Sequence, residues 1–401
     1  MKKSENSMKR PTNRRAFLTN GMVAAGAATM GASLLPGTSA AFGGDGDSAP
    51  ITKGDIAILT FLSALEQVEA DLWIQYAELG GATNQGLSPI DLELNGQKIV
   101  TGLAPDYITG LLVLDGDMPQ YIADNTDDEI SHHRFLNNYL ESKGGKAIDL
   151  RKDFAILPPS KVTGVPQTGR LTNLKQLTID TKWWTRFRSE TANPDFGGTF
   201  ENAVPDLAKG PHPAIPLSDA DLGVDNQGNI STHLQAIANT AGFHFAFIEQ
   251  GGSSLYPALA QKVTNLEVLR VLLSIGGSEI MHFQTWSDKA GNAAHLTDGD
   301  LTFPVLDGSN DPNTGATGTN AIADAFQANL IMPEPTLFLN KAFGPVSILR
   351  PTSTQQGGAV ASVVSFAEDG LFLDPATNKN TGIVDRLMRL AEEADEARRQ
   401  F

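Results

Sequence analysis

The sequence of 401 residues contains no cysteine. Disulfide bonds, thiolate metal sites and a cysteine nucleophile are therefore excluded. Basic residues are also scarce, because 30 Lys and Arg stand against 46 Asp and Glu and give a net charge of -16. A chain this acidic is a poor partner for nucleic acid or for an anionic membrane surface. Its apolar fraction of 41% is normal for a globular protein with a buried core.

Residues 1–41 have the composition of an export signal. A basic stretch ending in Arg14 and Arg15 precedes a weakly apolar run rich in Ala and Gly, and small residues offer cleavage after Ala40 or Ala41. The paired arginines of NRRAFLT are typical of a twin-arginine signal. A short membrane anchor is the alternative, although Gly, Thr and Asn interrupt the apolar run. We therefore expect a periplasmic or secreted protein, exported through the twin-arginine route, with no membrane contact after cleavage.

Four segments have the apolar spacing of long helices. They span residues 55–81, about 118–143, 231 to about 263, and 265–291. Ser231 and Asn265 are expected to cap the third and fourth helices, since short polar side chains accept the first free backbone N–H groups. The sequence thus predicts an all-α core built as a four-helix bundle.

The connections between these segments are unequal. Residues 82–117 form an insertion with a short hairpin at LELNGQKIV, and residues 144–230 form a long crossover rich in Pro and Gly. The predicted bundle domain spans 50–295 and is followed by a C-terminal extension, 296–401, that ends in an amphipathic helix. The apolar stripe of that helix can dock on the bundle or on a second subunit.

Two of the seven histidines follow a glutamate at the same spacing. Glu129 precedes His132 by three residues, and Glu279 precedes His282 by three. Residues three apart share one face of a helix, so each pair can act on one ligand.

The first and third helices each add a glutamate. Glu69 and Glu249 are both followed seven residues later by a tyrosine, Tyr76 and Tyr256. Glu66, one turn earlier, is the alternative on the first helix, and we prefer Glu69 because it alone repeats this spacing. The two tyrosines are core aromatics or hydrogen-bond donors to the site.

The resulting order is Glu, Glu-x-x-His, Glu, Glu-x-x-His. A four-helix bundle with this order can build a two-metal carboxylate site. Iron and manganese accept carboxylate oxygen and imidazole nitrogen, and four carboxylates balance two divalent ions. We therefore predict two iron ions, or manganese, held by Glu69, Glu129, His132, Glu249, Glu279 and His282. No catalytic residue is assigned.

The stretches EADLWIQY, EISHH, EQGGSSLY and EIMHF resemble the ferritin-like superfamily, and most of all its exported desiccation-associated branch. The resemblance implies a ferritin-like bundle with a dinuclear iron or manganese site. It also implies redox chemistry of peroxidase, catalase or ferroxidase type on dioxygen, peroxide or ferrous iron, linked to protection from oxidative stress. The alternatives are a structural or desiccation-protective protein without turnover, and iron sequestration. Partners are then a small-molecule oxidant or a metal ion. Assembly as a homo-oligomer stays open, but the long crossover and extension argue against a ferritin-type cage.

Two Gly-Gly pairs flank the predicted site, Gly251-Gly252 after Glu249 and Gly276-Gly277 before Glu279. Each glycine costs a helix interior about 1 kcal/mol relative to Ala. We expect them to allow either a close approach of the third and fourth helices or a local helix distortion.

Overall fold

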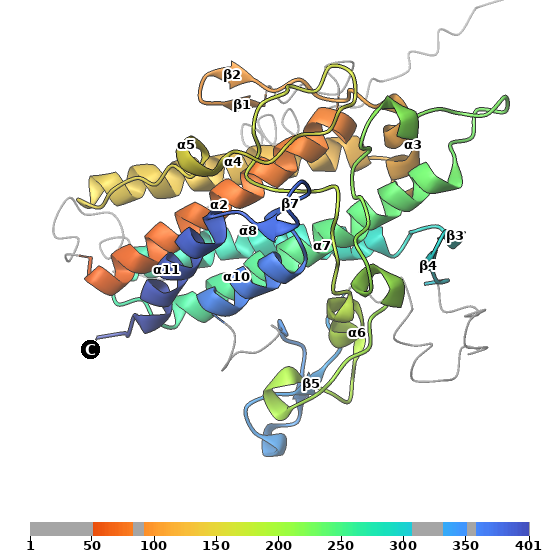
Figure 1. Cartoon of the computed structure of the whole chain (residues 1–401). Helices are drawn as coiled ribbons and strands as arrows, with labels where there is room; N and C mark the ends of the chain where they lie inside the picture. The colour runs from red at the N-terminus through yellow and green to blue at the C-terminus, as the bar shows by residue number, and fades with distance from the viewer. Residues whose placement is uncertain (1–50, 83–91, 307–331, 351–357, 401) are drawn as a thin grey trace, which may run out of the picture. The chain divides into compact units, whose positions relative to one another are not determined.

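The computed structural model describes residues 51–82, 92–306, 332–350 and 358–400, so the predicted export signal lies outside the described residues. The long helices are α2 (Lys53–Gly80), α4 (Met118–Ser142), α7 (Thr232–Ala260) and α8 (Leu266–Ala290) (Figure 1). They correspond to the four predicted segments and confirm the all-α four-helix core.

Shorter elements occupy the connections between these helices and the C-terminal extension after α8. The helices are α3 (Pro105–Leu114), α5 (Arg151–Phe154), α6 (Lys182–Arg188), α10 (Ala359–Glu368) and α11 (Ile383–Glu396), with 3-10 turns η1 (Pro194–Phe196), η2 (Pro205–Ala208), η3 (Asp219–Asp221) and η4 (Lys341–Phe343). The strands pair antiparallel as β1 (Glu93–Leu94) with β2 (Gln97–Lys98), β3 (Leu296–Asp298) with β4 (Leu301–Phe303), β5 (Thr336–Leu337) with β6 (Pro345–Val346), and β7 (Leu373–Asp374) with β8 (Lys379–Asn380). The first pair is the hairpin expected at LELNGQKIV, whereas α3 and α10 were not expected.

Polar side chains fix where the bundle helices begin. Thr52 and Asp55 form a capping box at α2, and the second oxygen of Asp55 accepts the backbone N–H of Thr264 at 2.8 Å. The start of α2 is thereby tied to the turn between α7 and α8. Ser231 and Asn265 cap α7 and α8 as predicted.

α2 packs along α4, and α7 packs along α8. Aromatic rings join the two helix pairs, since Trp73 of α2 stacks on Phe245 of α7 at 4.9 Å and on Trp286 of α8 at 5.1 Å between ring centroids. Buried rings of this size contribute apolar area and directional packing together. They form the centre of the core beside the predicted site.

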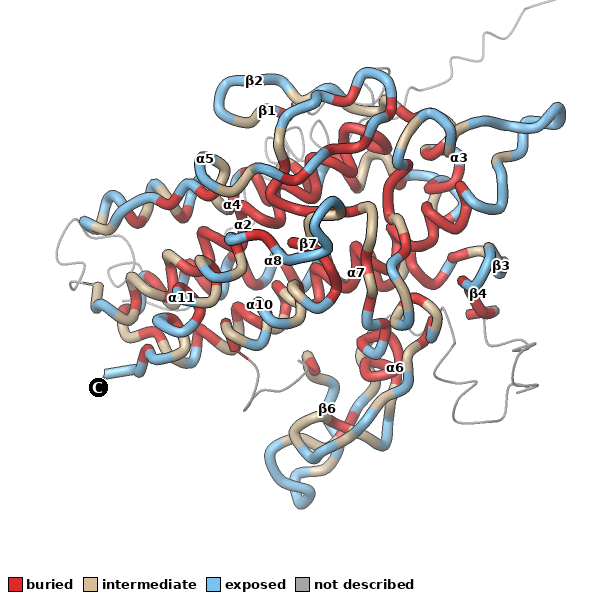
Figure 2. The backbone as a smooth tube through the Cα atoms, viewed as in Figure 1, coloured by how far each residue is buried: buried red, intermediate tan, exposed pale blue. Residues whose placement is uncertain are grey.

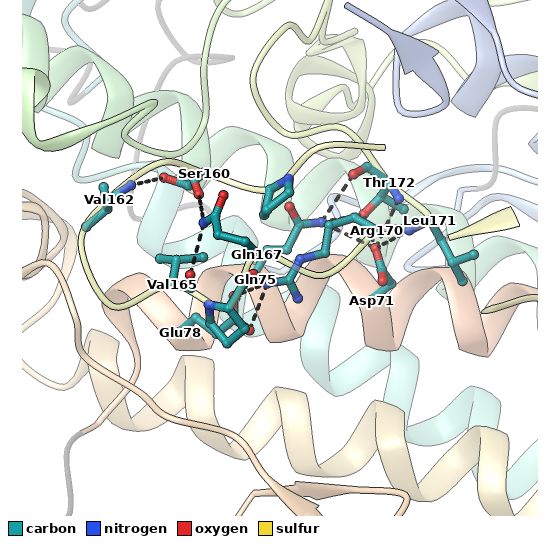
Figure 3. Close-up of polar contacts among 12 residues, drawn as sticks. Asp71, Gln75, Glu78, Ser160, Val162, Val165, Gln167, Arg170, Leu171 and Thr172 are labelled. Atoms are coloured by element: carbon teal, nitrogen blue, oxygen red, sulfur yellow. Dashed lines mark hydrogen bonds and ion pairs between the residues drawn. The ribbon is translucent and has the colours of Figure 1, made fainter. Parts of the chain in front are cut away.

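α2 is buried over almost its whole length (Figure 2). The long crossover covers one polar face of this helix. One oxygen of Asp71 accepts the backbone N–H groups of Leu171 and Thr172 at 2.9 and 3.0 Å (Figure 3). Two turns later, Glu78 pairs with the buried Arg170 at 2.7 Å. Buried polar groups are tolerated when their partners are present, so these contacts hold the crossover on the bundle.

We expect Asp71→Ala to lower the free energy of unfolding by about 3 kcal/mol, because buried backbone donors of the crossover lose their acceptor. Urea unfolding measures the change. The control is Asp153→Ala, which removes an exposed carboxylate of the same crossover and should change stability by about 0.5 kcal/mol or less. Equal effects of the two substitutions would contradict this role of Asp71.

The C-terminal extension docks on the bundle of the same chain. α11 packs against α2 and α10, and α10 packs against α7. This packing buries three residues of the apolar stripe of α11, namely Ile383, Leu387 and Leu390. This decides between the two docking partners that the sequence left open. In the part of the chain that the structure describes, no helix has the length and apolarity needed to cross a membrane.

Candidate metal centre

Six side chains from the four long helices meet in the bundle interior. They form two overlapping groups, Glu66, Glu129, His132 and Glu279 in the first and Glu129, Glu249, Glu279 and His282 in the second. Within each group, one ligand atom from every residue lies within 4.8 Å of the others. All six residues are buried. Glu129 and Glu279 belong to both groups, as carboxylates that bridge two ions would.

The two histidines direct the same nitrogen into the cluster. Nδ1 of His132 lies 3.1 Å from carboxylate oxygens of both Glu129 and Glu279. Nδ1 of His282 lies 3.1 Å from Glu129 and 3.3 Å from Glu249. The imidazole rings are 6.1 Å apart, so each ring serves one end of the cluster.

The structure places Glu66 in the first group, while the predicted Glu69 lies outside both groups. Glu69 is nevertheless buried, and burial together with repulsion from Glu279 raises its pKa well above the usual range. Both glutamates point toward the interior because residues three apart share a helix face. The other five predicted residues come together as expected, and their role as metal ligands stays a prediction.

The register of the repeat explains the choice of Glu66. Tyr256, seven residues after Glu249, donates its hydroxyl to Glu66 across the bundle. Trp73, seven residues after Glu66, donates its indole N–H to Glu249 at 2.9 Å. In the repeat, the counterpart of Tyr256 is therefore Trp73 and not Tyr76. The sequence analysis matched Tyr76 with Tyr256 and so selected Glu69, whereas the structure matches Trp73 with Tyr256 and brings Glu66 into the cluster.

Further donors orient the carboxylates, and the sequence analysis did not identify them. The amide of Asn125 donates to Glu129 at 2.8 Å and to Glu249 at 3.0 Å. Trp286 holds that amide through its indole N–H, at 2.7 Å from the Asn125 oxygen. Asn125 lies four residues before Glu129 on the same face of α4, and this spacing is the only sequence signal for it.

The outer nitrogen of His282 has a carboxylate partner. Nε2 of His282 lies 3.0 Å from Asp128. A carboxylate on the outer nitrogen fixes the ring and makes the inner nitrogen a stronger donor. The equivalent position before Glu279 is Ser278, which has no carboxylate. The two ends of the cluster therefore differ chemically.

Protons take up the negative charge of the metal-free cluster. Burial opposes charge on His132, but Glu66 and Glu129 outweigh it and raise the pKa of the imidazole far above its usual range. His282 behaves likewise, because Glu249 and Asp128 outweigh its burial. Burial, and then repulsion from Glu129, raises the pKa of Glu279. Metal ions bind deprotonated ligands and would displace these protons.

The comparison with protein families decides the classification. The model of the ferritin-like domain matches residues 54–291, which include all four long helices. The chain belongs to the ferritin-like domain family. No curated protein and no solved structure matches the chain. The match ends before β3, so the segment that carries α10 and α11 lies outside the matched residues.

The donor atoms of this ferritin-like domain fit a metal pair. Several of its buried cluster atoms lie near other cluster atoms without forming a hydrogen bond, namely Oε2 of Glu66, Oε2 of Glu249, both oxygens of Glu279 and Nδ1 of His282. Buried polar atoms without partners are costly and call for an explanation. Carboxylate oxygens with imidazole nitrogens form a donor set suited to iron or manganese. The fold and the cluster thus support metal binding.

Glycines make room for the cluster between α7 and α8. A Cβ atom on Gly252 would lie 2.4 Å from a carboxylate oxygen of Glu279, and one on Gly276 would lie 2.7 Å from Cβ of Tyr256. α7 and α8 are continuous α-helices through these positions. Of the two alternatives, the close approach is observed, at one glycine of each pair. Gly251 instead faces Phe366 of α10, and Gly277 faces open space.

Gly252→Ala is expected to displace Glu279 and to reduce metal bound per chain, because the added methyl occupies the place of the carboxylate. Gly277→Ala is the control, since its Cβ would meet nothing within 4 Å and Ala favours a helix by about 1 kcal/mol. Elemental analysis after identical purification gives the metal content. Full metal content in the Gly252 variant would refute the steric argument.

The remaining histidines do not join the cluster. His212 bonds to the backbone oxygen of Asp206 in η2, and His295 to that of Phe303 in β4. His233 lies 2.7 Å from Asp298. His133 lines a pocket of about 220 Å³ beside the crossover. His244 lies in the core, where its Nδ1 is 2.7 Å from the hydroxyl of Tyr76.

Proposed function

We propose that the protein is an exported ferritin-like oxidoreductase that holds two iron or manganese ions and acts on peroxide, dioxygen or ferrous iron. One observation carries the proposal. Two groups of buried ligand atoms share Glu129 and Glu279, and each group adds one histidine and one further glutamate. This arrangement suits a pair of ions held side by side, and two-metal sites of this composition are known in ferritin-like bundles.

A bound metal pair would supply the electrons that dioxygen or peroxide needs. The chain's own residues would bind and position it. The four carboxylates and two imidazoles supply the donor atoms, while Asn125, Trp73 and Tyr256 fix the direction of the carboxylates. His132 and His282 are only 9% and 8% exposed, so little bulk water reaches the cluster.

Export is part of the same proposal. Arg14 and Arg15, followed by an apolar stretch and small residues, support the twin-arginine route. A route that carries folded proteins suits a protein whose metal is held deep in its core. A role in protection from oxidative stress, and assembly as a homo-oligomer, are further predictions.

The deciding experiment measures metal content and peroxide consumption of protein recovered after native export. Two iron or manganese ions per chain with peroxide turnover would support the proposal. Bound metal without turnover, or no metal at all, would favour a structural or desiccation-protective protein. Many iron ions per chain would favour sequestration. Replacing Arg14 and Arg15 by lysine should leave the protein in the cytoplasm if the twin-arginine route is used.

A further inference from the structure

Three buried titratable side chains near the cluster have no role in holding metal. Tyr76 of α2 and His244 of α7 are fully buried, and Asp369 at the end of α10 is 3% exposed. The Tyr76 hydroxyl lies 2.7 Å from Nδ1 of His244. Nε2 of His244 lies 3.8 Å from Oδ2 of Asp369, and neither of these two atoms has a hydrogen-bond partner.

A buried polar chain of this kind costs stability that an apolar core would not. The ferritin-like domain also does not supply all of it, because Asp369 comes from the extension. A backbone hydrogen bond fixes the Asp369 side chain, whose Oδ1 accepts the N–H of Leu371 at 2.7 Å. Side-chain packing alone does not explain why three polar groups are aligned here.

Aromatic rings connect Tyr76 to the cluster. The indole N–H of Trp73 donates to Glu249, a residue of the proposed metal site. The ring of Trp73 lies 5.7 Å from that of Tyr76, and Phe245 lies between them at 4.9 Å from Trp73 and 4.6 Å from Tyr76. Electrons can therefore move between the cluster and Tyr76 over short steps between neighbouring rings, which are stacked at Trp73 and Phe245 and tilted or edge-on at Tyr76.

The protonation states of Tyr76 and His244 suit an electron donor that passes its proton to a single acceptor. Burial raises the pKa of Tyr76 well above its usual range, so the phenol holds its proton until it is oxidised. Burial lowers the pKa of His244 to about 3, so the imidazole is neutral and Nδ1 can accept a proton. Burial also raises the pKa of Asp369 well above its usual range. An imidazolium facing this carboxyl would lower that pKa again, because an opposite charge favours the carboxylate.

We propose that Tyr76 is a one-electron redox site, with His244 as its proton acceptor and Asp369 as the residue that positions and stabilises that histidine. In the step, the phenol loses one electron, which passes through Trp73 to peroxide or dioxygen reacting at the metal cluster. The phenolic O–H bond breaks, and its proton forms an N–H bond at Nδ1 of His244. The products are a neutral tyrosyl radical and an imidazolium, and the oxidant gains one electron. The step rests on the proposed function, because that reaction supplies the oxidant.

The test uses electron paramagnetic resonance on freeze-quenched samples of the iron-loaded protein mixed with hydrogen peroxide. A tyrosyl signal is expected in the wild type and should be lost in Tyr76→Phe. Tyr107→Phe is the matched control, because Tyr107 is also fully buried but donates to the backbone oxygen of Ala214, which cannot take a proton. In His244→Leu, any remaining radical should decay at least tenfold faster and lose the spectral shift that a hydrogen-bonded phenoxyl shows. Asp369→Asn should shorten the lifetime less.

A metal-free arm separates this proposal from the proposed function. Frozen metal-free protein is photo-oxidised with ultraviolet light and annealed, so that the oxidised site moves to the most easily oxidised ring. A tyrosyl signal that Tyr76→Phe removes and Tyr107→Phe keeps would support the redox site even if metal binding or peroxide turnover fails. An equal signal in wild type and Tyr76→Phe, in protein that binds metal and consumes peroxide, would overturn the redox site and leave the proposed function intact.

Discussion

Replacing Glu279 by glutamine is expected to abolish metal binding while leaving the fold intact. Glu279 belongs to both ligand groups, so the change removes one negative donor from each proposed ion. Loss of a partner that only supports a ligand costs about 10–100-fold in affinity, and loss of a shared ligand should cost more than about 100-fold. Metal titration followed by elemental analysis measures the loss.

The same substitution should not destabilise the metal-free protein. Burial and then Glu129 raise the pKa of Glu279, so in the absence of metal the folded chain holds this carboxyl protonated. Glutamine resembles that neutral form in shape and polarity. A carboxyl whose folded-state pKa is raised contributes stability at low pH and loses it as the pH rises from the unfolded-state pKa. The raised pKa values of His132 and His282 act in the same direction.

Metal-free wild type should therefore lose stability relative to Glu279→Gln as the pH rises from 5 to 8. Urea unfolding of both proteins in a chelator tests this. With metal present, the order should reverse, because ions displace the protons and stabilise the wild type alone. A wild type whose unfolding is insensitive to metal at every pH would contradict the assignment of these residues as ligands.

Replacing Glu66 by glutamine is expected to remove one of the two ions. Glu66 belongs only to the group that contains His132, so the donors around His282 stay complete. The paired variant is Glu69→Gln, one turn away on α2 and equally buried. Burial and the repulsion of Glu279 raise the pKa of Glu69, so a neutral side chain there should preserve both ions and leave the metal-free protein at least as stable.

The metal content per chain decides between the two glutamates. It is measured for both variants after identical purification. One ion in Glu66→Gln and two in Glu69→Gln is the expected result. The opposite result would mean that the sequence comparison selected the right residue and that metal binding reorients α2 side chains. Loss of both ions in Glu66→Gln would show that the two positions fill only together.

Glu66 and Glu69 also show which features of the site the sequence alone can predict and which it cannot. Helical spacing predicted the four long helices, because an apolar stripe and a capping residue are local properties. The Glu-x-x-His pairs were recognisable for the same reason. The choice between Glu66 and Glu69 depended on which residue of α2 lies opposite Tyr256 of α7, and that is a contact between distant segments. The structure places Glu66 opposite Tyr256, and Trp73 takes the place on α2 that Tyr256 has on α7. A tryptophan and a tyrosine do not look equivalent in a sequence.

The same limit applies to the crossover and the extension. The contacts of Asp71 with Leu171 and Thr172 join residues about a hundred positions apart, and nothing near Asp71 in the sequence announces them. The stripe of α11 predicted that the helix docks somewhere, since an amphipathic face needs a partner. Its partner is α2 and α10, which only the folded chain could reveal.

Only one of the two cluster histidines has a carboxylate on its outer nitrogen in the part of the chain that the structure describes, so the two ends of the cluster are not equivalent. Asp128 supports His282, and the matching residue for His132 is Ser278. Two ions of the same element would then experience different ligand fields. In a Mössbauer spectrum, iron-loaded protein would show two distinct quadrupole doublets rather than one. At limiting iron, the doublet from the His282 end would grow first. The two metal positions would then fill in a fixed order, with the position at His282 occupied before the position at His132.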